Sequence, residues 1–407
     1  MKLAVLWRNG LIKYYLSFRT PKYMELDKKL KVLPLTKSNP STLLALYGKP
    51  NLTPMWVADM DFQMAKPIQE ALRERVLNSG FGYEYKPVSF FTAQKSWYKN
   101  HYQIELDKKE VLYSPTITTT ISFLIENFTS ENDGIILQPP VFMEFREVIR
   151  NTRRKIVKNP LKLEDNQYKI DFNDLEEKAK QDNNKVLIIC NPHNPVGRVW
   201  SAQELEKIVT ICKDNNVLLI SDEIHKDIVL FGNKFTSVLQ FAHLYSNIVV
   251  CTSEAKTFNL CGISDAMVIT KNDNIIKALS ATFKKYNLGR TNVLTRVALE
   301  TAYSHGYLWL KEVLEIIEKN VTTIEQTLEN SKINLIKPEG TYQVWLGFHD
   351  VYNDTKEMFK NITQKTGIAL NAGHWFGREG ALFIRMNIAT SNEKVSEAIV
   401  KIKKAVI

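Results

Sequence analysis

The chain has 407 residues, of which 44% are hydrophobic and 24% are charged. These proportions are typical of a globular protein with a sizeable core, and they exclude a disordered, collagen-like or disulfide-stapled chain. The net charge is +10, and residues 1–35 hold +6 of it, because they carry eight basic residues and two acidic ones. The rest of the chain shows no basic stripe interleaved with aromatic residues, so we expect no nucleic-acid partner.

The start of the chain predicts neither a signal peptide nor a membrane anchor. The apolar run Leu3–Trp7 is too short for a signal-peptide core, and no apolar stretch approaches the roughly 18–20 residues of a membrane helix. Glu25 and Asp27 follow the basic residues quickly and serine is sparse, which argues against a transit peptide. We expect residues 1–35 to be a basic extension, unstructured or over-extended, with Met24 as a candidate for the functional initiator.

The four cysteines have no CxxC spacing and no matching histidine pattern. Cysteines of this kind are typical of free thiols in a reducing cytoplasm. We therefore expect a cytoplasmic protein without a disulfide framework or a metal site.

The middle of the chain alternates between strand and helix signals. A capping box, Ser201 with Glu204, opens a predicted helix that ends near Asn215. Continuous apolar runs separated by helices predict an α/β fold with a mostly parallel sheet covered on both faces; the runs are Gly134–Leu137, Val186–Cys190, Val217–Ile220, Ile248–Cys251 and Ala266–Thr270.

A long helical stretch, Thr291–Asn330, and then a fresh α+β pattern follow the last of these runs. We predict a large domain over residues 66–295. A smaller α+β domain is expected from residues 296–407, with residues 36–65 packed against it.

Polar clusters follow three of the apolar runs. They are Asn191–Arg198, Ser221–His225 and Thr252–Phe258. Ligands of open α/β sheets bind outside the carboxyl ends of the strands, so these clusters predict a site. A lysine amine, a carboxylate and an amide beside small hydroxyl residues would suit pyridoxal phosphate: the amine bonds the aldehyde, the carboxylate keeps the ring nitrogen protonated, and a helix N-terminus holds the phosphate.

An ordered set of short motifs over residues 50–400 resembles the fold-type-I pyridoxal-phosphate enzymes of the class I/II aminotransferase superfamily, in particular the cystathionine β-lyase, or C–S lyase, branch. The motifs are WVADMDF at 56–62, FGY at 81–83, PVF at 140–142, CNPHNPVGR at 190–198, SDEIH at 221–225, KTFN at 256–259, EGTY at 339–342 and FIRMN at 383–387. Each motif alone is weak evidence, and their joint occurrence in this order carries the resemblance.

The resemblance implies roles for individual residues. Lys256 would be the lysine that bonds the cofactor, Asp222 the partner of the ring nitrogen and Arg385 the residue that binds the substrate α-carboxylate. The other implied cofactor contacts are Asn194 and His225 near the ring oxygen, Phe142 stacked on the ring, Ser253, Ile117 and Thr118 at the phosphate, and Tyr83, which would reach the phosphate in a neighbouring subunit. The last contact implies a homodimer with shared sites.

The chain departs from the branch at two places. Phe142 stands where the branch more often has tyrosine. The phosphate loop usually carries a glycine, and this chain reads Ser114-Pro-Thr-Ile-Thr118, so Thr116 either supplies a hydroxyl or narrows the approach of the backbone to the phosphate.

Each residue also has an ordinary structural interpretation. Asp222 could cap a helix, the Asn-Pro pairs could form a turn, and Arg385 could be a common ion-pair partner. We interpret His193 as structural, and Trp375-Phe376 either lines the substrate entrance or packs in the core.

Three functions remain open. The first is a C–S β-lyase that acts on cystathionine, cysteine or an S-conjugated cysteine and yields a thiol, pyruvate and ammonia. The second is an aminotransferase with the same cofactor. The third is a regulatory or scaffold protein that keeps the fold, with the basic extension as its contact to an acidic partner.

Overall fold

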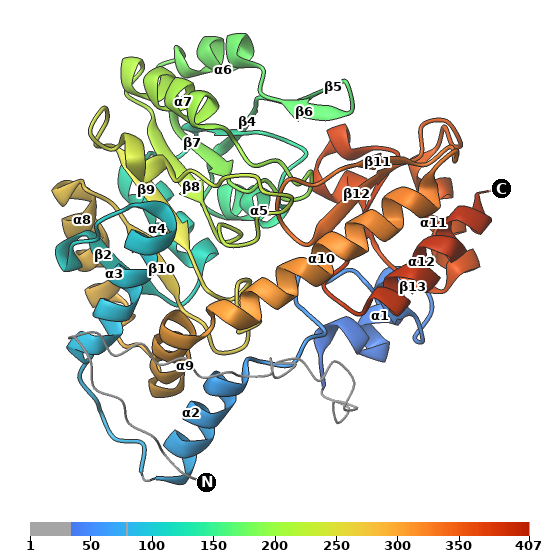
Figure 1. Cartoon of the computed structure of the whole chain (residues 1–407). Helices are drawn as coiled ribbons and strands as arrows, with labels where there is room; N and C mark the ends of the chain where they lie inside the picture. The colour runs from blue at the N-terminus through green and yellow to red at the C-terminus, as the bar shows by residue number, and fades with distance from the viewer. Residues whose placement is uncertain (1–33, 79, 407) are drawn as a thin grey trace, which may run out of the picture.

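The structure is a computed structural model that describes residues 34–78 and 80–406. Of the predicted extension, residues 1–35, only the last two residues are described, and the proposed start at Met24 lies outside the described residues. A seven-stranded sheet forms the centre of the larger part of the molecule (Figure 1). Its strands, in spatial order, are β2 (Val111–Ser114), β10 (Ala266–Ile269), β9 (Ile248–Thr252), β8 (Leu218–Asp222), β7 (Asn184–Cys190), β3 (Gly134–Leu137) and β4 (Lys155–Lys158).

The predicted mostly parallel sheet is confirmed. All neighbours from β9 to β4 pair in parallel, and β10 runs antiparallel to both β9 and β2. The bounds of β3 are those predicted, whereas β7 begins two residues earlier, at Asn184, and β8 continues through Asp222. Asp222 is therefore the last residue of a central strand.

Helices cover both faces of this sheet. Alternate strand residues pack into different clusters: Ile135 and Leu137 lie in one, Ile136 in the other. The first cluster is closed by α4 (Ile117–Phe128), α5 (Glu144–Asn151) and α8 (Asp273–Lys285). The second includes residues of α3 (Val88–Tyr102), α6 (Phe172–Ala179) and α7 (Ala202–Asp214). Burial of both faces explains why the strands are continuously apolar.

The predicted capping box is confirmed, whereas the predicted long helical stretch is divided into two helices. Ser201 caps α7 by accepting from Glu204 N, and the Glu204 carboxylate accepts from Ser201 N, as expected. The stretch Thr291–Asn330 forms two helices, α9 (Val293–His305) and α10 (Tyr307–Leu328). The break is at Gly306, where an added Cβ would lie 2.5 Å from the Phe258 ring, so the chain turns where only glycine fits.

The C-terminal part contains a second sheet and further helices. Its antiparallel order is β11 (Asn334–Ile336), β12 (Gln343–Gly347), β15 (Phe383–Asn387) and β14 (Asn371–Ala372). The helices α11 (Thr355–Thr366) and α12 (Asn392–Ala405) lie beside it with α10 (Figure 1). Two early elements, α1 (Pro40–Tyr47) and β1 (Thr53–Pro54), join this part, since β1 pairs with β13 (Ile368–Ala369). A domain division at residues 66 and 295 stays a prediction.

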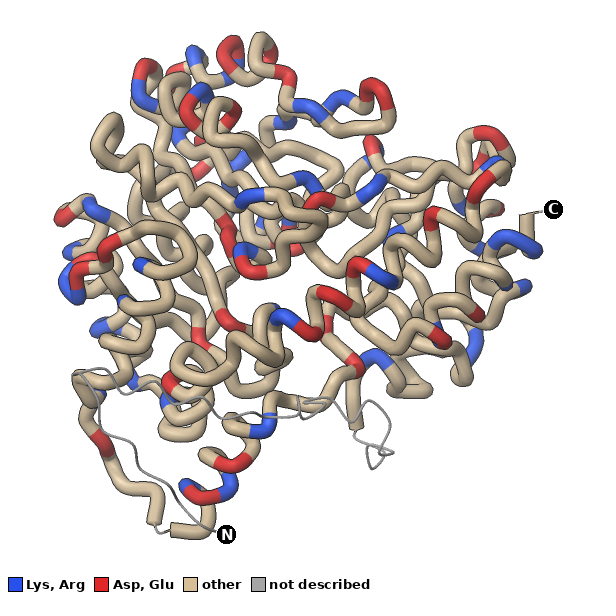
Figure 2. Tube along the Cα trace, in the orientation of Figure 1, with Lys and Arg blue, Asp and Glu red and all other residues tan. Residues whose placement is uncertain are grey.

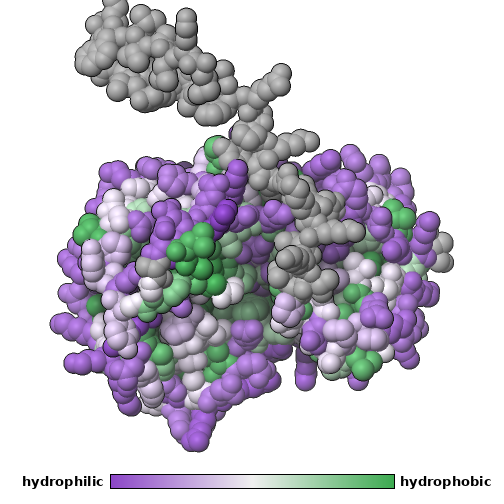
Figure 3. Space-filling model, turned by 90° about the horizontal axis from the view of Figure 1, so that it is seen from below, coloured by the Kyte–Doolittle hydropathy of each residue, from purple (hydrophilic) through white to green (hydrophobic). Residues whose placement is uncertain are grey.

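The remaining described elements lie at the periphery. They are α2 (Lys66–Leu77), which packs against α9, and the hairpin of β5 (Lys162–Glu164) and β6 (Gln167–Lys169). Basic and acidic residues are interspersed along the described chain (Figure 2), and apolar side chains gather in patches on the face seen in Figure 3. In residues 34–78 and 80–406, no helix is long and apolar enough to span a membrane.

Candidate active site

A cavity of about 390 Å³ lies at the carboxyl ends of the three neighbouring strands β7, β8 and β9. Parallel strands bring the segments that follow them to one edge of the sheet, and the three polar clusters meet there for this reason. Eight of the ten predicted site residues line the cavity: Ile117, Thr118, Phe142, Asn194, Asp222, His225, Ser253 and Lys256. Arg385 adjoins it through a hydrogen bond to Asn194.

Asp222 is a buried acid with little to neutralise it. Its side chain is 4% exposed, and within the described residues its carboxylate accepts one hydrogen bond, from Ile224 N at 3.0 Å. Burial raises the pKa of Asp222 to about 7, although the Ile224 amide and the Lys256 charge oppose the rise. A cation in the cavity would be the partner that this carboxylate needs.

Lys256 follows β9 and faces the same cavity. Its amine donates to Ala58 O at 2.6 Å and lies 3.6 Å from Cys261 Sγ. Neither contact is with a carboxylate, so the amine is held in place by neutral groups. An amine in such a position can bond an aldehyde without first breaking an ion pair.

Arg385 lies on β15 and is 3% exposed. Its guanidinium donates to Asn194 Oδ1 at 2.9 Å, Asn371 Oδ1 at 2.7 Å and Trp56 O at 2.8 Å, all of them neutral acceptors. Burial lowers the pKa of Arg385 to about 10, which leaves it charged at neutral pH. A buried cation without a carboxylate partner is suited to bind an anionic ligand, and the fork geometry matches a carboxylate.

The contact with Arg385 also orients Asn194. Because the amide oxygen of Asn194 accepts from the guanidinium, its NH₂ group faces away from Arg385 and is available to donate. Asn194 is thus positioned as a hydrogen-bond donor in the cavity, and its predicted role near the ring oxygen stays a prediction.

His225 is 2% exposed, and its Nδ1 has no hydrogen-bond partner in the described part of the chain. Burial, with the charges of Lys256 and Arg385, lowers the pKa of His225 to about 3, so the imidazole is neutral. Its ring packs edge-on against Tyr342 at 5.6 Å between centroids. The free nitrogen is a polar group that a ligand in the cavity can satisfy.

The opposite end of the cavity is rich in hydroxyl groups and in amides from the start of α4. Thr116 caps α4 by accepting from Thr119 N at 3.0 Å, and its hydroxyl lies 3.0 Å from that of Thr118. The amides of Ile117 and Thr118 belong to the first turn and have no partner within the helix. Ser253 accepts from Ala255 N and bonds Ser264 at 2.8 Å. This end suits a phosphate.

Tyr83 is the predicted residue that the structure does not bring to the cavity. It is 95% exposed and packs against the Arg290 guanidinium, 4.9 Å from the ring centroid. Its predicted role concerns a neighbouring subunit and stays a prediction.

The sequence analysis missed several residues of the site. Asn371 holds Arg385, and Ala58 O holds the Lys256 amine. Cys261, Ser264, Asp265 and Glu144 also line the cavity. Two of these positions carried a signal in the sequence, because Ala58 lies within the motif at 56–62 and Cys261 lies a few residues after the lysine. For Trp375 and Phe376 the sequence left entrance lining and core packing open. In the structure the Arg385 guanidinium lies 4.9 Å from the centroid of the Phe376 ring, and Trp375 packs against Phe359.

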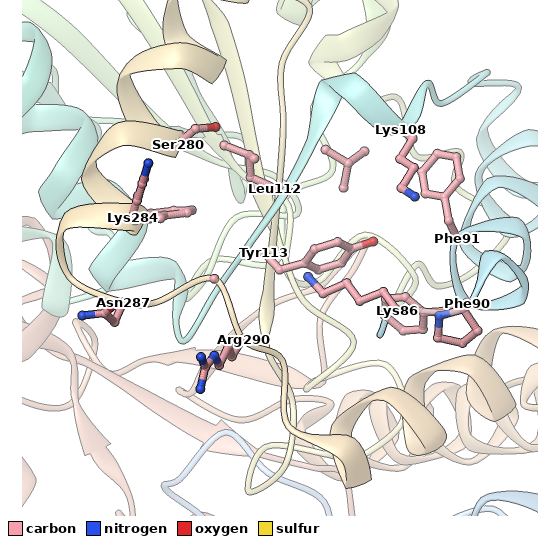
Figure 4. Close-up of a pocket in the computed structure, with 14 residues that line it drawn as sticks. Lys86, Phe90, Phe91, Lys108, Leu112, Tyr113, Ser280, Lys284, Asn287 and Arg290 are labelled. Atoms are coloured by element: carbon pink, nitrogen blue, oxygen red, sulfur yellow. The ribbon is translucent and has the colours of Figure 1, made fainter. Parts of the chain in front are cut away.

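A larger cavity, of about 540 Å³, lies between α3, β2 and α8 (Figure 4). Basic side chains line it together with apolar and aromatic ones; the basic residues are Lys86, Lys108, Lys284 and Arg290. None of the predicted site residues lines it, and it has no buried acid beside a lysine. Chemistry, rather than volume, identifies the smaller cavity as the site.

The charged and hydrogen-bonding groups that line the smaller cavity fit pyridoxal phosphate. A buried unpaired acid, an amine held by neutral groups, an amide donor and a helix N-terminus match the ring nitrogen, the aldehyde, the ring oxygen and the phosphate. The described residues contain no cluster of histidine, cysteine and acidic side chains that could hold a metal ion.

Comparison with known proteins agrees with this chemistry. The model of the family aminotransferase class I and II matches residues 64–402. The chain is 35% identical to cystathionine beta-lyase PatB of Bacillus subtilis over 88% of this chain and 94% of that protein. A pyridoxal-phosphate-bound putative aminotransferase of Clostridium difficile is 35% identical and superposes with a TM-score of 0.88 over 91% of this chain and 96% of its own. A C–S lyase of Staphylococcus hominis, also bound to pyridoxal phosphate, is 28% identical with a TM-score of 0.84 over 94% and 96%.

Proposed function

The chain belongs to the aminotransferase class I and II family, and on that premise we propose that it is a pyridoxal-phosphate-dependent C–S β-lyase. Its substrates would be cystathionine, cysteine or S-conjugated cysteines, which with one water yield a thiol, pyruvate and ammonia. The observation that carries the proposal is the meeting of an unpaired buried acid, Asp222, and an uncompensated buried cation, Arg385, around the Lys256 amine.

The proposed roles of Asp222 and Arg385 follow from their charges. Bound pyridoxal phosphate supplies an aldehyde for the substrate amine and a ring that accepts electrons from Cα. The Asp222 carboxylate holds the proton on the ring nitrogen, since opposite charges at short range favour the charged forms. The Arg385 fork binds the substrate α-carboxylate and so fixes which bond at Cα faces the lysine.

Lys256 acts at the reacting carbon. Its amine would hold the cofactor and, when free, would act as the general base that removes the Cα proton. Loss of that proton allows a thiolate to leave Cβ. The neutral contacts of the amine, with Ala58 O and Cys261 Sγ, leave it free to change its protonation state without losing an ion pair.

The test measures the formation of pyruvate by the cofactor-loaded protein. The full chain, loaded with pyridoxal phosphate, is incubated with cystathionine while pyruvate is assayed, with Lys256→Ala as the control. We expect pyruvate from the wild type and none above background from the variant. Absence of pyruvate with every thioether amino acid tried would overturn the lyase proposal.

An aminotransferase is the second candidate, favoured by the name of the Clostridium difficile protein, which is as similar in sequence as PatB. The two reactions differ in whether a proton reaches the cofactor before a β-substituent leaves. Incubation with alanine, which has no leaving group, separates them: stoichiometric conversion of the cofactor to its amine form would support the aminotransferase. A scaffold protein, in contrast, would have no need for the lysine.

We also propose a cytoplasmic homodimer with shared sites. The support is the position of Tyr83, 95% exposed on a segment whose other apolar residues are also exposed, among them Leu77, Phe81 and Val88. If Tyr83 serves the neighbouring site, Tyr83→Ala and Lys256→Ala proteins are each poorly active, and mixed dimers regain one intact site. Random mixing of equal amounts makes about half of the dimers mixed, and each mixed dimer has one intact site of two. The mixture should therefore show about a quarter of the wild-type activity. No recovery on mixing would contradict shared sites.

A further inference from the structure

Directly behind the candidate site lies a group of buried charges that the proposed mechanism does not use. Lys226, Asp227 and Glu254 have side chains that are 0%, 3% and 1% exposed. The Lys226 amine lies 3.3 Å from Asp227 Oδ2 and 3.4 Å from Glu254 Oε1, and it donates to Thr252 Oγ1 at 3.0 Å. A charge buried this deeply is tolerated only when it is paired and hydrogen-bonded.

The three residues belong to the two segments that carry the chemistry. Lys226 follows His225 directly, four residues after Asp222, and Glu254 precedes Lys256 by two residues. The ion pair between Lys226 and Glu254 therefore ties the segment after β8 to the segment after β9. Backbone contacts add to this tie, because Glu223 N donates to Cys251 O at 2.8 Å and Thr252 Oγ1 donates to Glu223 O at 3.1 Å.

Asp227 holds the lysine segment from its other side. Its Oδ2 accepts from Thr257 Oγ1 at 2.7 Å, and Thr257 is the residue after Lys256. The segment 254–257 is thus held by contacts on both sides of Lys256: Glu254 contacts Lys226, and Thr257 donates to Asp227.

Helices α3 and α9 fix this group to the rest of the molecule. Trp97 Nε1 donates to Asp227 Oδ1 at 3.0 Å, and the Tyr102 hydroxyl donates to the same oxygen. The Tyr303 hydroxyl donates to Glu254 Oε1. Both carboxylates are therefore satisfied and rigidly placed, in contrast to Asp222.

We propose that Lys226, with Glu254 and Asp227, is a positioning unit that sets the spacing between the Lys256 amine and the segment carrying Asp222 and His225. The inference rests on the proposed function. It assigns no contact with substrate to Lys226; the ion pair acts through the two segments that it joins. A shift of about 1 Å in a reacting group is enough to lower a rate by roughly a hundredfold.

The test compares Lys226→Met, Glu254→Gln and the double variant. Lys226→Met leaves the carboxylates of Asp227 and Glu254 without a buried cation, whereas Glu254→Gln leaves Lys226 paired with Asp227 alone. Both single variants should lower the melting temperature of the cofactor-loaded protein, and Lys226→Met should lower it more. The double variant removes both charges of the Lys226–Glu254 pair and keeps Asp227, which still accepts from Trp97, Tyr102 and Thr257, so its melting temperature should be higher than that of Lys226→Met. The ion pair between the segments is still missing in the double variant, although the hydrogen bonds of Glu223 and Asp227 to the other segment remain. We therefore expect kcat in the double variant to stay at least tenfold below the wild type, with KM within about threefold.

A second measurement reports on the lysine without using activity. Borohydride reduction followed by peptide mapping gives the fraction of bound cofactor that is attached to Lys256. That fraction should be lower in the double variant than in the wild type. Arg154→Met is the matched control: Arg154 donates to Thr129 at 2.9 Å beside the amino ends of β3 and β4, at the edge of the sheet opposite the site. It should lower the melting temperature and leave the attached fraction and kcat unchanged.

The outcomes separate the two proposals. If the double variant regains kcat and full attachment together with its melting temperature, the ion pair is merely structural and the inference is wrong. If the wild type itself carries no cofactor on Lys256, the proposed function fails instead.

Discussion

Replacing Asp222 by asparagine should stabilise the cofactor-free protein at neutral and alkaline pH. The ordinary pKa of an aspartate side chain, 3.8, is raised to about 7 at this position, chiefly by burial. A rise of roughly three pH units corresponds to about 4 kcal/mol, at about 1.4 kcal/mol per unit, by which the folded state disfavours the ionised acid. Asparagine carries no charge and keeps an oxygen that can accept from Ile224 N, so the folded variant avoids this penalty.

The stabilising effect of Asp222→Asn should depend on pH, because the folded and unfolded states of the wild type take up the proton on Asp222 at different pH values. Above about pH 7 the acid is ionised in the folded and unfolded states, and wild-type stability carries the whole penalty. As the pH falls from about 7 to about 4, only the folded state takes up the proton, so wild-type stability rises. Below about pH 4 both states are protonated and the penalty is gone. The advantage of Asp222→Asn should therefore be greatest at pH 8 and should shrink steadily towards pH 4.

The assay is urea unfolding of both cofactor-free proteins between pH 4.5 and pH 8. The neighbouring Glu223 offers a matched control, because burial also raises its pKa to about 7. Its carboxylate, however, accepts from Ser237 Oγ at 2.7 Å and Val238 N at 3.0 Å. Glu223→Gln places an NH₂ group among donors and should destabilise the protein by about 1–3 kcal/mol. A variant Asp222→Asn that is no more stable than wild type at pH 8, or a gain that does not fall with pH, would refute the reasoning.

Four further predictions concern the same cavity. Lys256→Ala should abolish covalent attachment of the cofactor, measured by borohydride mapping, and lower kcat by about a thousandfold or more. Arg385→Lys should lower kcat/KM about a hundredfold, since a lysine cannot form the two parallel bonds of the fork. Asn371→Ala removes the acceptor at 2.7 Å from Arg385 and should raise KM about fivefold with kcat little changed, measured by steady-state kinetics. His225, whose pKa is lowered to about 3, should show no titration between pH 5 and pH 9 by NMR.

The parallel sheet and the meeting of its strand-end residues could be predicted from the sequence, because both follow from local apolar patterns and from a general rule of α/β topology. The continuous apolar runs predicted the parallel sheet, and the rule that ligands bind at strand carboxyl ends placed Asn194, Asp222 and Lys256 at one edge. The structure brings these three side chains to one cavity. Their roles toward the cofactor stay proposals, but their meeting required only that three neighbouring strands be parallel.

Other features depend on contacts between distant segments, which no local pattern reveals. The helical pattern is continuous through Gly306, and the break there reflects the approach of the Phe258 ring. Asn371 lies far from Arg385 in sequence and meets it because β14 pairs with β15. Lys226 looks like an ordinary solvent-facing lysine in the sequence, and only the packing of α3 and α9 shows that it is buried.

Two groups of buried charges in this protein differ in how they are satisfied, and the difference supports the proposed site. Lys226 pairs with Asp227 and Glu254, and these two carboxylates accept hydrogen bonds from surrounding aromatic side chains. Asp222 and Arg385 are equally buried, yet neither has a partner of opposite charge among its hydrogen bonds in the described chain. Among the described residues, Glu223 is also buried without a paired cation, but its carboxylate accepts three hydrogen bonds, whereas that of Asp222 accepts one. An acidic and a basic side chain without charged partners at one cavity suit a ligand with a cationic and an anionic group, which supports the proposed roles of Asp222 toward the cofactor ring and of Arg385 toward the substrate carboxylate.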